Sequence, residues 1–349
     1  MSTVLVGMSG GVDSSVAAAL LVEAGHEVVG VTLKLWGGDS DTGCCSVSDV
    51  DDARRVAQQL GIDHLVFNFT DDFDHHVVDT YVDAHTRGET PNPCIECNRH
   101  LKFDRLTRRA EQLGFDAVAT GHHARVVRDV GGAWRVARGA DTAKDQSYVV
   151  HMLDQQTLAA TMFPVGTMTK AEVREHATRL GLRTAGKADS QDVCFITKSG
   201  REAFLGARIP LRAGRVVDTS GVVVGSVPAV ELVTIGQRRG LGLGGGDPSL
   251  YAIDIDVAAA TITVGSRETL LRDSLVLHNM SWSAGPMTGP VRAQVSAHGA
   301  SARCTAGADG GDDIVVTWGE PHRRVAAGQS VVLYDETDQF VLGGGLAIR

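Results

Sequence analysis

The segment VLVGMSGGVDSSVAAALL, residues 4–21, restricts the fold more than any other part of the chain. A β-branched run passes through a glycine-rich turn into a pattern rich in Ala, Leu and Val. This predicts a buried strand at Val4–Val6 and a helix at Ser14–Glu23. Gly10 and Gly11 allow close approach of a ligand, and the N–H groups at the start of the helix favour a phosphate there. An ordinary tight turn is the alternative.

This turn is not a Walker A loop, because it lacks the Lys of the GxxxxGK[ST] pattern. The missing Lys argues against simple transfer of the γ-phosphate. Ser9, Ser14 and Ser15 add hydroxyl groups, and Asp13 is placed to help hold Mg²⁺.

Short apolar runs alternate with helical patterns over roughly the first 120 residues, which predicts βαβ units around a parallel sheet. The expected strands are 4–6, 27–33, 65–69 and 117–120. Helices are expected at 14–23, 71–85, 98–113 and 172–180. A further helix is expected to be capped by Ser46 or Ser48 and to end at Gln59. The fold class is therefore α/β, with a Rossmann-like amino-terminal domain.

The pattern changes after about residue 200, where short alternating strands replace helices, as in β-barrels and sandwiches. Strands are expected at 222–224, 251–255, 261–264, 314–318, 331–334 and 340–342. We expect a catalytic domain at 1–199, a small β-rich domain at 200–270 and a carboxy-terminal β-barrel at 271–349.

Composition excludes several classes of protein. With 43% hydrophobic and 21% charged residues, the chain is not disordered, and it has no apolar run long enough to span a membrane. No signal peptide is apparent, so a cytoplasmic location with reduced thiols is expected. The net charge of −9 argues against nonspecific nucleic-acid binding, although Lys and Arg outnumber acids between His85 and Arg128.

Cysteines are the next candidates for chemistry. Cys94 and Cys97 form a CxxC pair and Cys194 lies far along the chain, whereas Cys44, Cys45 and Cys304 are interpreted as spectators. A CxxC pair is half of a zinc site, but tetrahedral zinc needs two more ligands, so we expect no metal ligands and no prosthetic group. Thiol chemistry is favoured, because Cys97 directly precedes a basic helix pattern and a helix amino terminus lowers the pKa of a thiol.

The loop SGGVDSS resembles the PP-loop of N-type ATP pyrophosphatases, which cleave ATP to AMP and pyrophosphate. The chain as a whole resembles the tRNA-specific 2-thiouridylase family. The segments that carry this resemblance are GMSGGVDSS, GCCS, GETPNPCIECN, ATGHHAR, KDQSYV, DSQDVCFI, TIGQRRGLG, AAGQSVVLY and LGGG.

The resemblance implies two sets of binding residues. The residues expected to bind ATP are Gly7, Met8, Ser9, Gly10, Gly11, Val12, Asp13, Ser14, Leu33 and Gly121. The residues expected to contact tRNA are Asn92, Pro93, Cys94, His122, Lys144, Asp145, Gln146, Ser296, Ala297 and Gln329. A plain polar turn is the alternative at 144–146, and a solvated loop is the alternative at His122 and His123. Arg238 and Arg239 either contact phosphate or belong to an exposed basic loop.

The resemblance also implies a mechanism. ATP would adenylate the carbon-2 oxygen of the wobble uridine, and Cys194 would carry a persulfide received from a sulfur-relay protein or cysteine desulfurase. Cys97 would be the partner nucleophile, leaving a Cys97–Cys194 disulfide together with 2-thiouridine, AMP and pyrophosphate.

Two positions depart from the family pattern. Cys94 stands where the family often has Asp, which removes a carboxylate base, and Ser296–Ala297 replaces a basic–aromatic pair, which weakens the expected tRNA contact. Two other functions remain open from the sequence. One is a PP-loop ligase that adenylates a small molecule for attack by an amine, which would need neither thiol. The other is a non-catalytic nucleotide- or zinc-binding adaptor.

Overall fold

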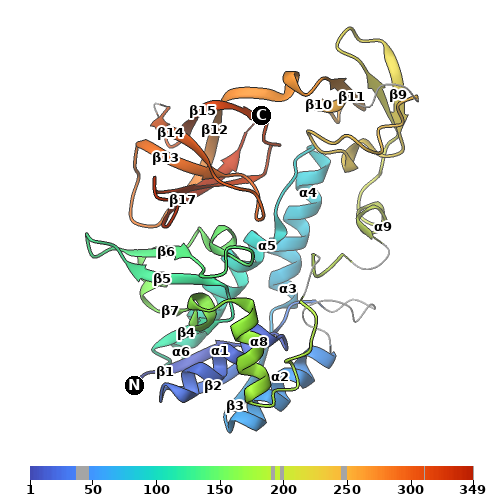
Figure 1. Ribbon diagram of the computed structural model, residues 1–349. Helices are drawn as coiled ribbons and strands as arrows, with labels where there is room; N and C mark the ends of the chain where they lie inside the picture. Colours follow the sequence, from blue (N-terminus) through green and yellow to red (C-terminus); the bar gives the residue numbers. More distant parts are fainter. Residues whose placement is uncertain (37–46, 190–192, 197–199, 245–249, 310, 349) are drawn as a thin grey trace.

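Within its described residues, the protein is an α/β structure that contains a parallel sheet, a four-stranded sheet, a closed six-stranded barrel and a two-stranded hairpin. The computed structural model describes residues 1–36, 47–189, 193–196, 200–244, 250–309 and 311–348 (Figure 1). Cys44, Cys45 and Ser46 lie outside the described residues.

The parallel sheet has the strand order β3-β2-β1-β4-β7, with every neighbouring pair parallel. Its strands are β1 (Thr3–Gly7), β2 (Glu27–Lys34), β3 (Asp63–Asn68), β4 (Ala117–Thr120) and β7 (Thr161–Met162). The chain leaves β1 toward β2 on one side, while β4 lies on the other side. The strand order therefore reverses between β1 and β4, and in such sheets ligands bind beyond the carboxyl ends of the strands at that point.

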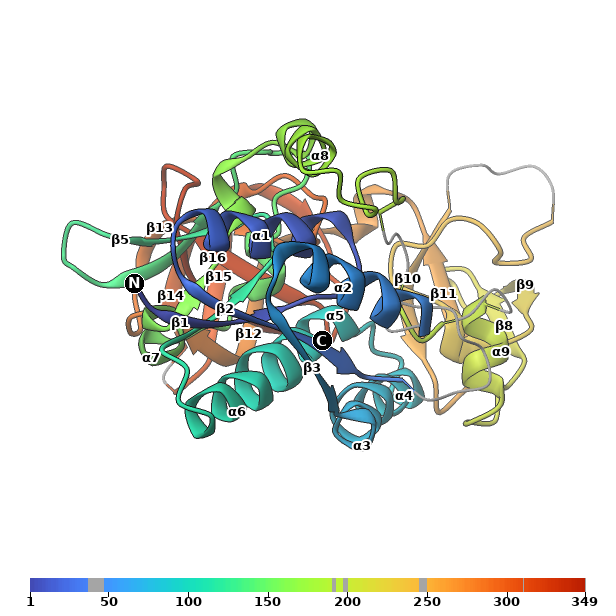
Figure 2. The same cartoon turned by 90° about the horizontal axis from the view of Figure 1, so that it is seen from below.

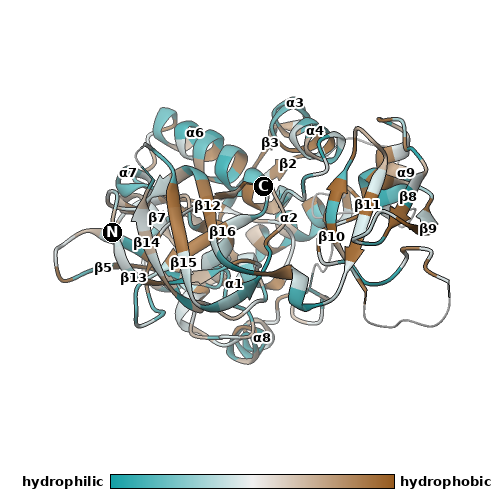
Figure 3. Cartoon of the chain, turned by 90° about the horizontal axis from the view of Figure 1, so that it is seen from above, coloured by the Kyte–Doolittle hydropathy of each residue, from teal (hydrophilic) through white to brown (hydrophobic). Residues whose placement is uncertain are grey.

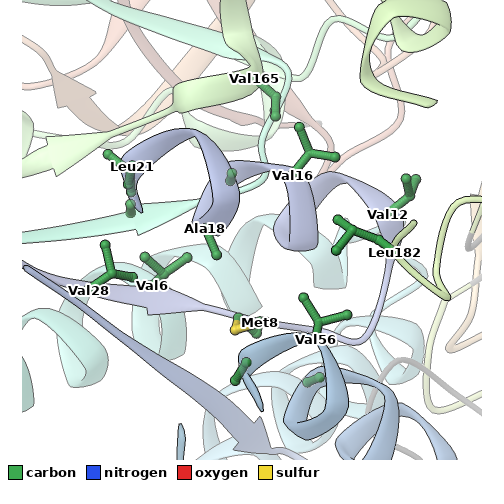
Figure 4. Close-up of a cluster of buried hydrophobic side chains, with 14 of the residues drawn as sticks. Val6, Met8, Val12, Val16, Ala18, Leu21, Val28, Val56, Val165 and Leu182 are labelled. Carbon is green, nitrogen blue, oxygen red and sulfur yellow. The ribbon is translucent and has the colours of Figure 1, made fainter. Parts of the chain in front are cut away.

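Alternating side chains of β1 serve the two faces of this sheet. Val4 and Val6 pack into a core with α1 (Val12–Glu23), α2 (Val47–Leu60) and α8 (Lys170–Arg179), part of which is drawn in Figure 4. Leu5 faces the opposite core. That core is covered by α3 (Thr70–Phe73), η1 (Asp74–Asp79), α4 (Thr80–Thr86), η2 (Cys97–Arg105) and α6 (Leu106–Gln112). Figure 2 shows α1 and α2 on one side of the sheet and α3 and α6 on the other.

Helices lie where they were expected at 71–85 and 98–113, but each contains a π-helical stretch. These stretches are η1 and η2, and η2 continues a short helix α5 (Pro93–Glu96). The second helix begins at Pro93, so the expectation that Cys97 directly precedes the helix is wrong: Cys97 lies within it. A π-helical turn has one extra residue, so it changes the direction in which the following side chains point, and such turns are frequent at functional sites. Cys97 is the first residue of η2.

A hairpin formed by β5 (Ala124–Arg128) and β6 (Trp134–Arg138) was not predicted from the sequence. The other unpredicted elements of this region are the strand β7 and the helices η3 (Ser147–Val150), α7 (Gln155–Ala159), η4 (Pro164–Thr167) and α9 (Gly200–Gly206). The hairpin contacts the barrel through its backbone: Ala137 forms a β-bridge with Phe340, and the Arg138 N–H donates to the Gln339 carbonyl (3.0 Å).

The β-rich half contains the expected strands and several more. The four-stranded sheet, in the order β10-β11-β8-β9, consists of β8 (Gly214–Val217), β9 (Val223–Val227), β10 (Tyr251–Asp256) and β11 (Thr261–Gly265), with η5 (Val230–Leu232) and η6 (Glu268–Leu270) nearby. The barrel, in the order β12-β15-β14-β13-β16-β17, consists of β12 (Leu271–Trp282), β13 (Gly289–Gln294), β14 (Ala302–Ala308), β15 (Ile314–Arg323), β16 (Ser330–Tyr334) and β17 (Val341–Ala347).

The barrel is fixed against the catalytic region by charged and apolar contacts. Arg138 bonds to Asp145 of its own region (2.8 Å) and to Gln294 (2.7 Å) and Asp338 (2.7 Å) of the barrel, and its guanidinium stacks on Tyr334. Figure 1 shows the barrel directly above the β5–β6 hairpin. Arg138 therefore fastens the barrel to the hairpin.

The distribution of hydropathy matches these layers. In Figure 3 the residues of α6 are coloured largely hydrophilic, and those along β16 are coloured hydrophobic. Among the helices of the described residues, none is both long enough and apolar enough to cross a bilayer.

His151 makes stability depend on pH. His151 is buried where the barrel meets the catalytic region. Its ring packs directly against Gly344 of β17: a Cβ added to Gly344 would lie 2.5 Å from the ring. Burial lowers the pKa of His151 to about 4, and the hydrogen bond to the Tyr148 carbonyl offsets this only in part. The unfolded chain regains a pKa near 6.5 and binds a proton first, so stability is complete above pH 6.5 and falls as the pH drops toward 4.

We expect His151 to account for about 2 kcal/mol of lost unfolding free energy between pH 7 and pH 5. Urea unfolding of His151→Gln at both pH values should show a smaller loss than that of the unchanged protein. The exposed His298, changed to Gln, is the control and should leave the loss unchanged. Equal pH dependence in His151→Gln would show that His151 does not have this effect.

Candidate active site

The predicted phosphate loop lies at the carboxyl end of β1 and leads directly into α1. Gly10 has a φ of +71°, and a Cβ there would lie 2.3 Å from the Asp49 carbonyl oxygen, so only glycine fits. Gly11 occupies the N-cap position and has no side chain with which to cap the helix. The N–H groups of the first turn and the positive end of the helix dipole are therefore available to an anion.

Two serine hydroxyls shape the loop from inside. The Ser9 N–H donates to Ser14 Oγ (3.2 Å), and the hydroxyls of Ser14 and Ser15 donate to the Gly11 carbonyl (3.1 and 2.8 Å). Met8 and Val12 point into the core, so only their backbone atoms are available for the predicted ATP contact.

The end of β4 closes the other side of the loop. A Cβ on Gly121 would lie 2.5 Å from the Ser14 nitrogen and 2.6 Å from the Asp13 carbonyl carbon, so the two backbones touch. The structure thus brings Gly121 beside residues 7–14, as the ATP-site prediction requires. Leu33, at the end of β2, packs in the core on the opposite face of the sheet from α1.

Asp13 is contacted by a lysine and a histidine from distant parts of the chain. Lys170 Nζ lies 2.7 Å from both Asp13 oxygens, and His123 Nε2 lies 3.0 Å from Oδ1. Burial alone would raise the pKa of Asp13, but the hydrogen bonds from His123 and Lys170 outweigh it and lower the pKa. Asp13 is therefore ionised at neutral pH.

A second lysine supports the loop from behind. Lys187 Nζ donates to the Gly10 carbonyl (2.9 Å), to Asp49 Oδ1 (2.5 Å) and to Asp52 Oδ2 (2.7 Å). These contacts tie the loop to α2. Neither Lys170 nor Lys187 was predicted from the sequence, since neither belongs to a motif that marks nucleotide binding.

The CxxC segment begins at a capped helix start. Asn92 Oδ1 accepts the Cys94 N–H (3.1 Å), and Pro93 occupies the first helical position. Cys94 is exposed, whereas Cys97 is buried at 8% exposure. Cys97 belongs to the same hydrophobic core cluster as Leu5 and Leu33, on one face of the parallel sheet.

Cys194 packs against this same cluster. The structure therefore places the two cysteines predicted to be catalytic in one hydrophobic cluster, although they are 194 − 97 = 97 residues apart in the sequence. The adjacent Phe195, which is 1% exposed, makes this possible. Its ring contacts those of Trp36, Phe73, Tyr81 and Phe204 at centroid distances of 5.1–6.2 Å.

We expect Phe195→Ala to slow thiol-dependent turnover on the order of 100-fold, because it removes the ring that anchors Cys194. The assay compares turnover with the rate at which a mild oxidant joins Cys97 to Cys194, and both rates should fall. Phe67→Ala, which removes a partly buried ring packed against the same cluster, is the control and should change neither rate strongly. A normal oxidation rate in Phe195→Ala would contradict the anchoring role.

The two histidines of ATGHHAR are both buried, so the alternative that they are solvated loop residues is wrong. His122 Nδ1 lies 2.6 Å from Thr120 Oγ1, and its ring packs against Phe103 and Phe163. Burial lowers the pKa of His122 well below its usual value, so the ring is neutral. Its predicted contact with the target base stays a prediction.

The segment Lys144–Gln146 has side chains that are already engaged within the protein. Lys144 pairs with Asp189 (2.8 Å), the buried Asp145 pairs with Arg138 (2.8 Å), and Gln146 accepts the His123 N–H (2.9 Å). The predicted tRNA contact of this segment also stays a prediction; the Lys144 side chain is 40% exposed.

Loops from the four-stranded sheet and from the barrel contact Thr90, which precedes the CxxC segment. The Thr90 N–H donates to the Ala327 carbonyl (2.8 Å), next to the predicted contact residue Gln329, and Thr90 Oγ1 donates to Thr234 Oγ1 (3.5 Å). Thr234 begins the loop that carries the exposed Arg238 and Arg239. Farther round the barrel, Ser296 is exposed, and Ala297 packs against the core shared with the hairpin.

Comparison with known proteins gives the family. Residues 2–198 match the model described as tRNA methyl transferase HUP domain, 202–266 the tRNA methyl transferase PRC-barrel domain, and 272–347 the Aminomethyltransferase beta-barrel domain. Similar proteins named tRNA-specific 2-thiouridylase MnmA occur in Chloroflexus aggregans (46% identity, 100% of this chain and 99% of the relative) and in Mycolicibacterium gilvum (47%, 95% and 94%). The relative in Symbiobacterium thermophilum is 44% identical over 99% of this chain and 92% of its own length. Since the similarity extends over nearly the whole chain, the protein belongs to the tRNA-specific 2-thiouridylase (MnmA) family.

Proposed function

We propose that this protein is a tRNA-uridine 2-sulfurtransferase that uses ATP to convert the wobble uridine of tRNA to 2-thiouridine. Family membership supports the reaction class. The structural observation that carries the proposal is the position of Cys97 and Cys194 in one cluster, on the sheet whose carboxyl edge bears the phosphate loop. A small-molecule ligase would need neither cysteine.

In the first step, the carbon-2 oxygen of uridine attacks the α-phosphorus of ATP, and pyrophosphate leaves. The base loses its N3 proton and becomes adenylated, which replaces a poor leaving group with AMP. The residues proposed to bind ATP are those of 7–14 with Leu33 and Gly121. In this step the first-turn N–H groups of α1 stabilise phosphate charge.

Mg²⁺ enters as the counter-ion of the substrate ATP, and it supplies positive charge to the phosphates. The carboxylate of Asp13 fits it, because carboxylate oxygens are ligands that Mg²⁺ prefers and Asp13 is ionised and partly exposed at the loop. His123 keeps Asp13 oriented from the buried side.

In the second step, sulfur replaces the adenylated oxygen. Cys194 carries a persulfide from a sulfur-relay protein or cysteine desulfurase, and its terminal sulfur attacks carbon 2. The Cys97 thiolate attacks Cys194 Sγ, which breaks the persulfide bond, and AMP leaves. The two cysteines are oxidised to a disulfide as the transferred sulfur is reduced, so an external reductant must restore both thiols before the next turnover.

The tRNA is proposed to contact Asn92–Cys94, His122, Lys144–Gln146, Ser296–Ala297 and Gln329. The loops that meet at Thr90 support a binding face shared between the catalytic region and the barrel. The division into domains at 1–199, 200–270 and 271–349 belongs to the same proposal, and the three separate sheets support it.

The experiment that tests the adenylation step measures AMP and pyrophosphate from ATP in the presence of Mg²⁺ and unmodified tRNA. We expect both products to require tRNA with uridine at the wobble position and to vanish when cytidine replaces it. Formation of AMP from ATP and a small amine, without any tRNA, would instead identify a ligase.

A further inference from the structure

The phosphate loop has no positive side chain of its own. Between Val4 and Ser15 the sole charged residue is Asp13, which is negative. Helix N–H groups carry only partial charges, whereas the triphosphate of ATP carries close to four negative charges. Enzymes that cleave such a substrate place cations where this charge lies. The sequence pattern therefore leaves a charge requirement that other parts of the chain must meet.

Among the described residues, Lys170 is a cation that the fold places beside the loop. It is the first residue of α8, whose start is fixed by a capping box between Thr169 and Glu172. Its side chain is only 12% exposed, and its ammonium reaches Asp13 (2.7 Å to each oxygen) and Asp189 (2.9 Å). A nearly buried charge interacts more strongly with a ligand than one in open solvent.

Asp189 forms ion pairs with three cationic side chains, one of which is Lys170. It also accepts from Lys144 (2.8 Å) and Arg174 (2.8 Å), so three cations surround two carboxylates, a formal charge of 3 − 2 = +1. Burial alone would raise the pKa of Asp189, but the bonds from Lys144 and Lys170 lower it well below its usual range. This cluster, Asp13–Lys170–Asp189–Lys144–Arg174, is called the loop cation cluster below.

We propose that Lys170 binds the β- and γ-phosphates of ATP and that Asp189 is the positioning residue that holds it at the loop. This inference rests on the proposed use of ATP. Phosphate oxygens replace Asp13 as acceptors of the Lys170 ammonium, which leaves the Asp13 carboxylate for Mg²⁺. The Lys170 charge then stabilises the pyrophosphate as its bond to the α-phosphorus breaks.

Lys187 does not fill this role. Its ammonium is held by the Gly10 carbonyl and two carboxylates, Asp49 and Asp52, on the α2 side of the loop. Lys187 therefore maintains the shape of the loop, and Lys170 is the lysine whose acceptor at the loop is the predicted Mg²⁺ ligand.

The test compares binding of ATP and AMP by calorimetry to the full-length protein and its Lys170→Ala and Lys170→Met variants. Loss of a charged contact to phosphate should weaken ATP binding roughly 10- to 100-fold. Binding of AMP should be unchanged, because AMP lacks the β- and γ-phosphates. Lys170→Arg should recover part of the ATP affinity, and Arg179→Ala, an exposed residue on the same helix, should bind both nucleotides normally.

Asp189→Asn should weaken ATP binding less than Lys170→Ala and again spare AMP, whereas Asp189→Glu should restore it. Unchanged ATP affinity in both Lys170 variants, or equal losses for ATP and AMP, would overturn the proposal. Failure of the unchanged protein to form AMP with tRNA would refute the proposed function instead, and the ATP–AMP comparison would still report on Lys170.

Discussion

Replacing either Cys97 or Cys194 with Ser is expected to abolish 2-thiouridine formation, while ATP still binds. Serine has nearly the shape of cysteine but can neither carry a persulfide nor attack one. Because the phosphate loop contains neither residue, calorimetry should find ATP affinity within about twofold of the unchanged protein. Nucleoside analysis of the treated tRNA measures the loss of thiolation.

The two variants should differ in whether the active site still accepts a persulfide. Cys97→Ser retains the Cys194 thiol and should still accept a persulfide, whereas Cys194→Ser should accept none at the active site. Cys304→Ala is the matched control, because burial raises the pKa of Cys304 to about 12 and keeps it a thiol inside the barrel. Thiolation by either serine variant at the normal rate would contradict the two-thiol mechanism.

Gly121→Ala is expected to weaken ATP binding strongly. Its methyl group would lie 2.5 Å from the Ser14 nitrogen, a contact with backbone that no side-chain rotation relieves. Either β4 or the start of α1 must shift, at an overpacking cost of roughly 1–3 kcal/mol, and the first-turn N–H groups then point away from the phosphates. We expect ATP affinity to fall on the order of 100-fold.

Gly186→Ala is the control, since a Cβ there meets nothing within 4 Å, and it should bind ATP normally. Circular dichroism distinguishes a displaced loop from an unfolded chain. If folded Gly121→Ala bound ATP as tightly as the unchanged protein, the close approach of β4 to α1 would not be what shapes the site.

Local periodicity explains why so much of the α/β region could be predicted. The apolar runs of β1, β2 and β4 are bounded by glycines and polar residues, and β4 has the bounds that were expected. The hairpin β5–β6 was missed because ARVVR and WRVAR mix arginine with aliphatic residues, and their pairing is fixed by the barrel residues Gln339 and Phe340. Such tertiary contacts override local preference.

Convergence of distant residues could not be predicted without the family resemblance. Asp13 was identified from its position in the loop, but nothing in the sequence places Lys170 beside it, 157 residues later. The same holds for Phe195, whose four ring partners come from three separate segments. Asp145 shows the opposite case: the motif that contains it was noticed, while its buried pairing with Arg138 became visible only in the fold.

The central claim is that this protein makes 2-thiouridine by a route that needs ATP and both cysteines. The most direct measurement incubates it with ATP, Mg²⁺, unmodified tRNA and either sulfide or a persulfide-loaded donor protein, followed by mass spectrometry of the digested nucleosides. The account predicts 2-thiouridine at the wobble position, dependent on ATP and, with the persulfide donor, on Cys97 and Cys194. AMP release without any thionucleoside, even with the persulfide donor, would contradict it.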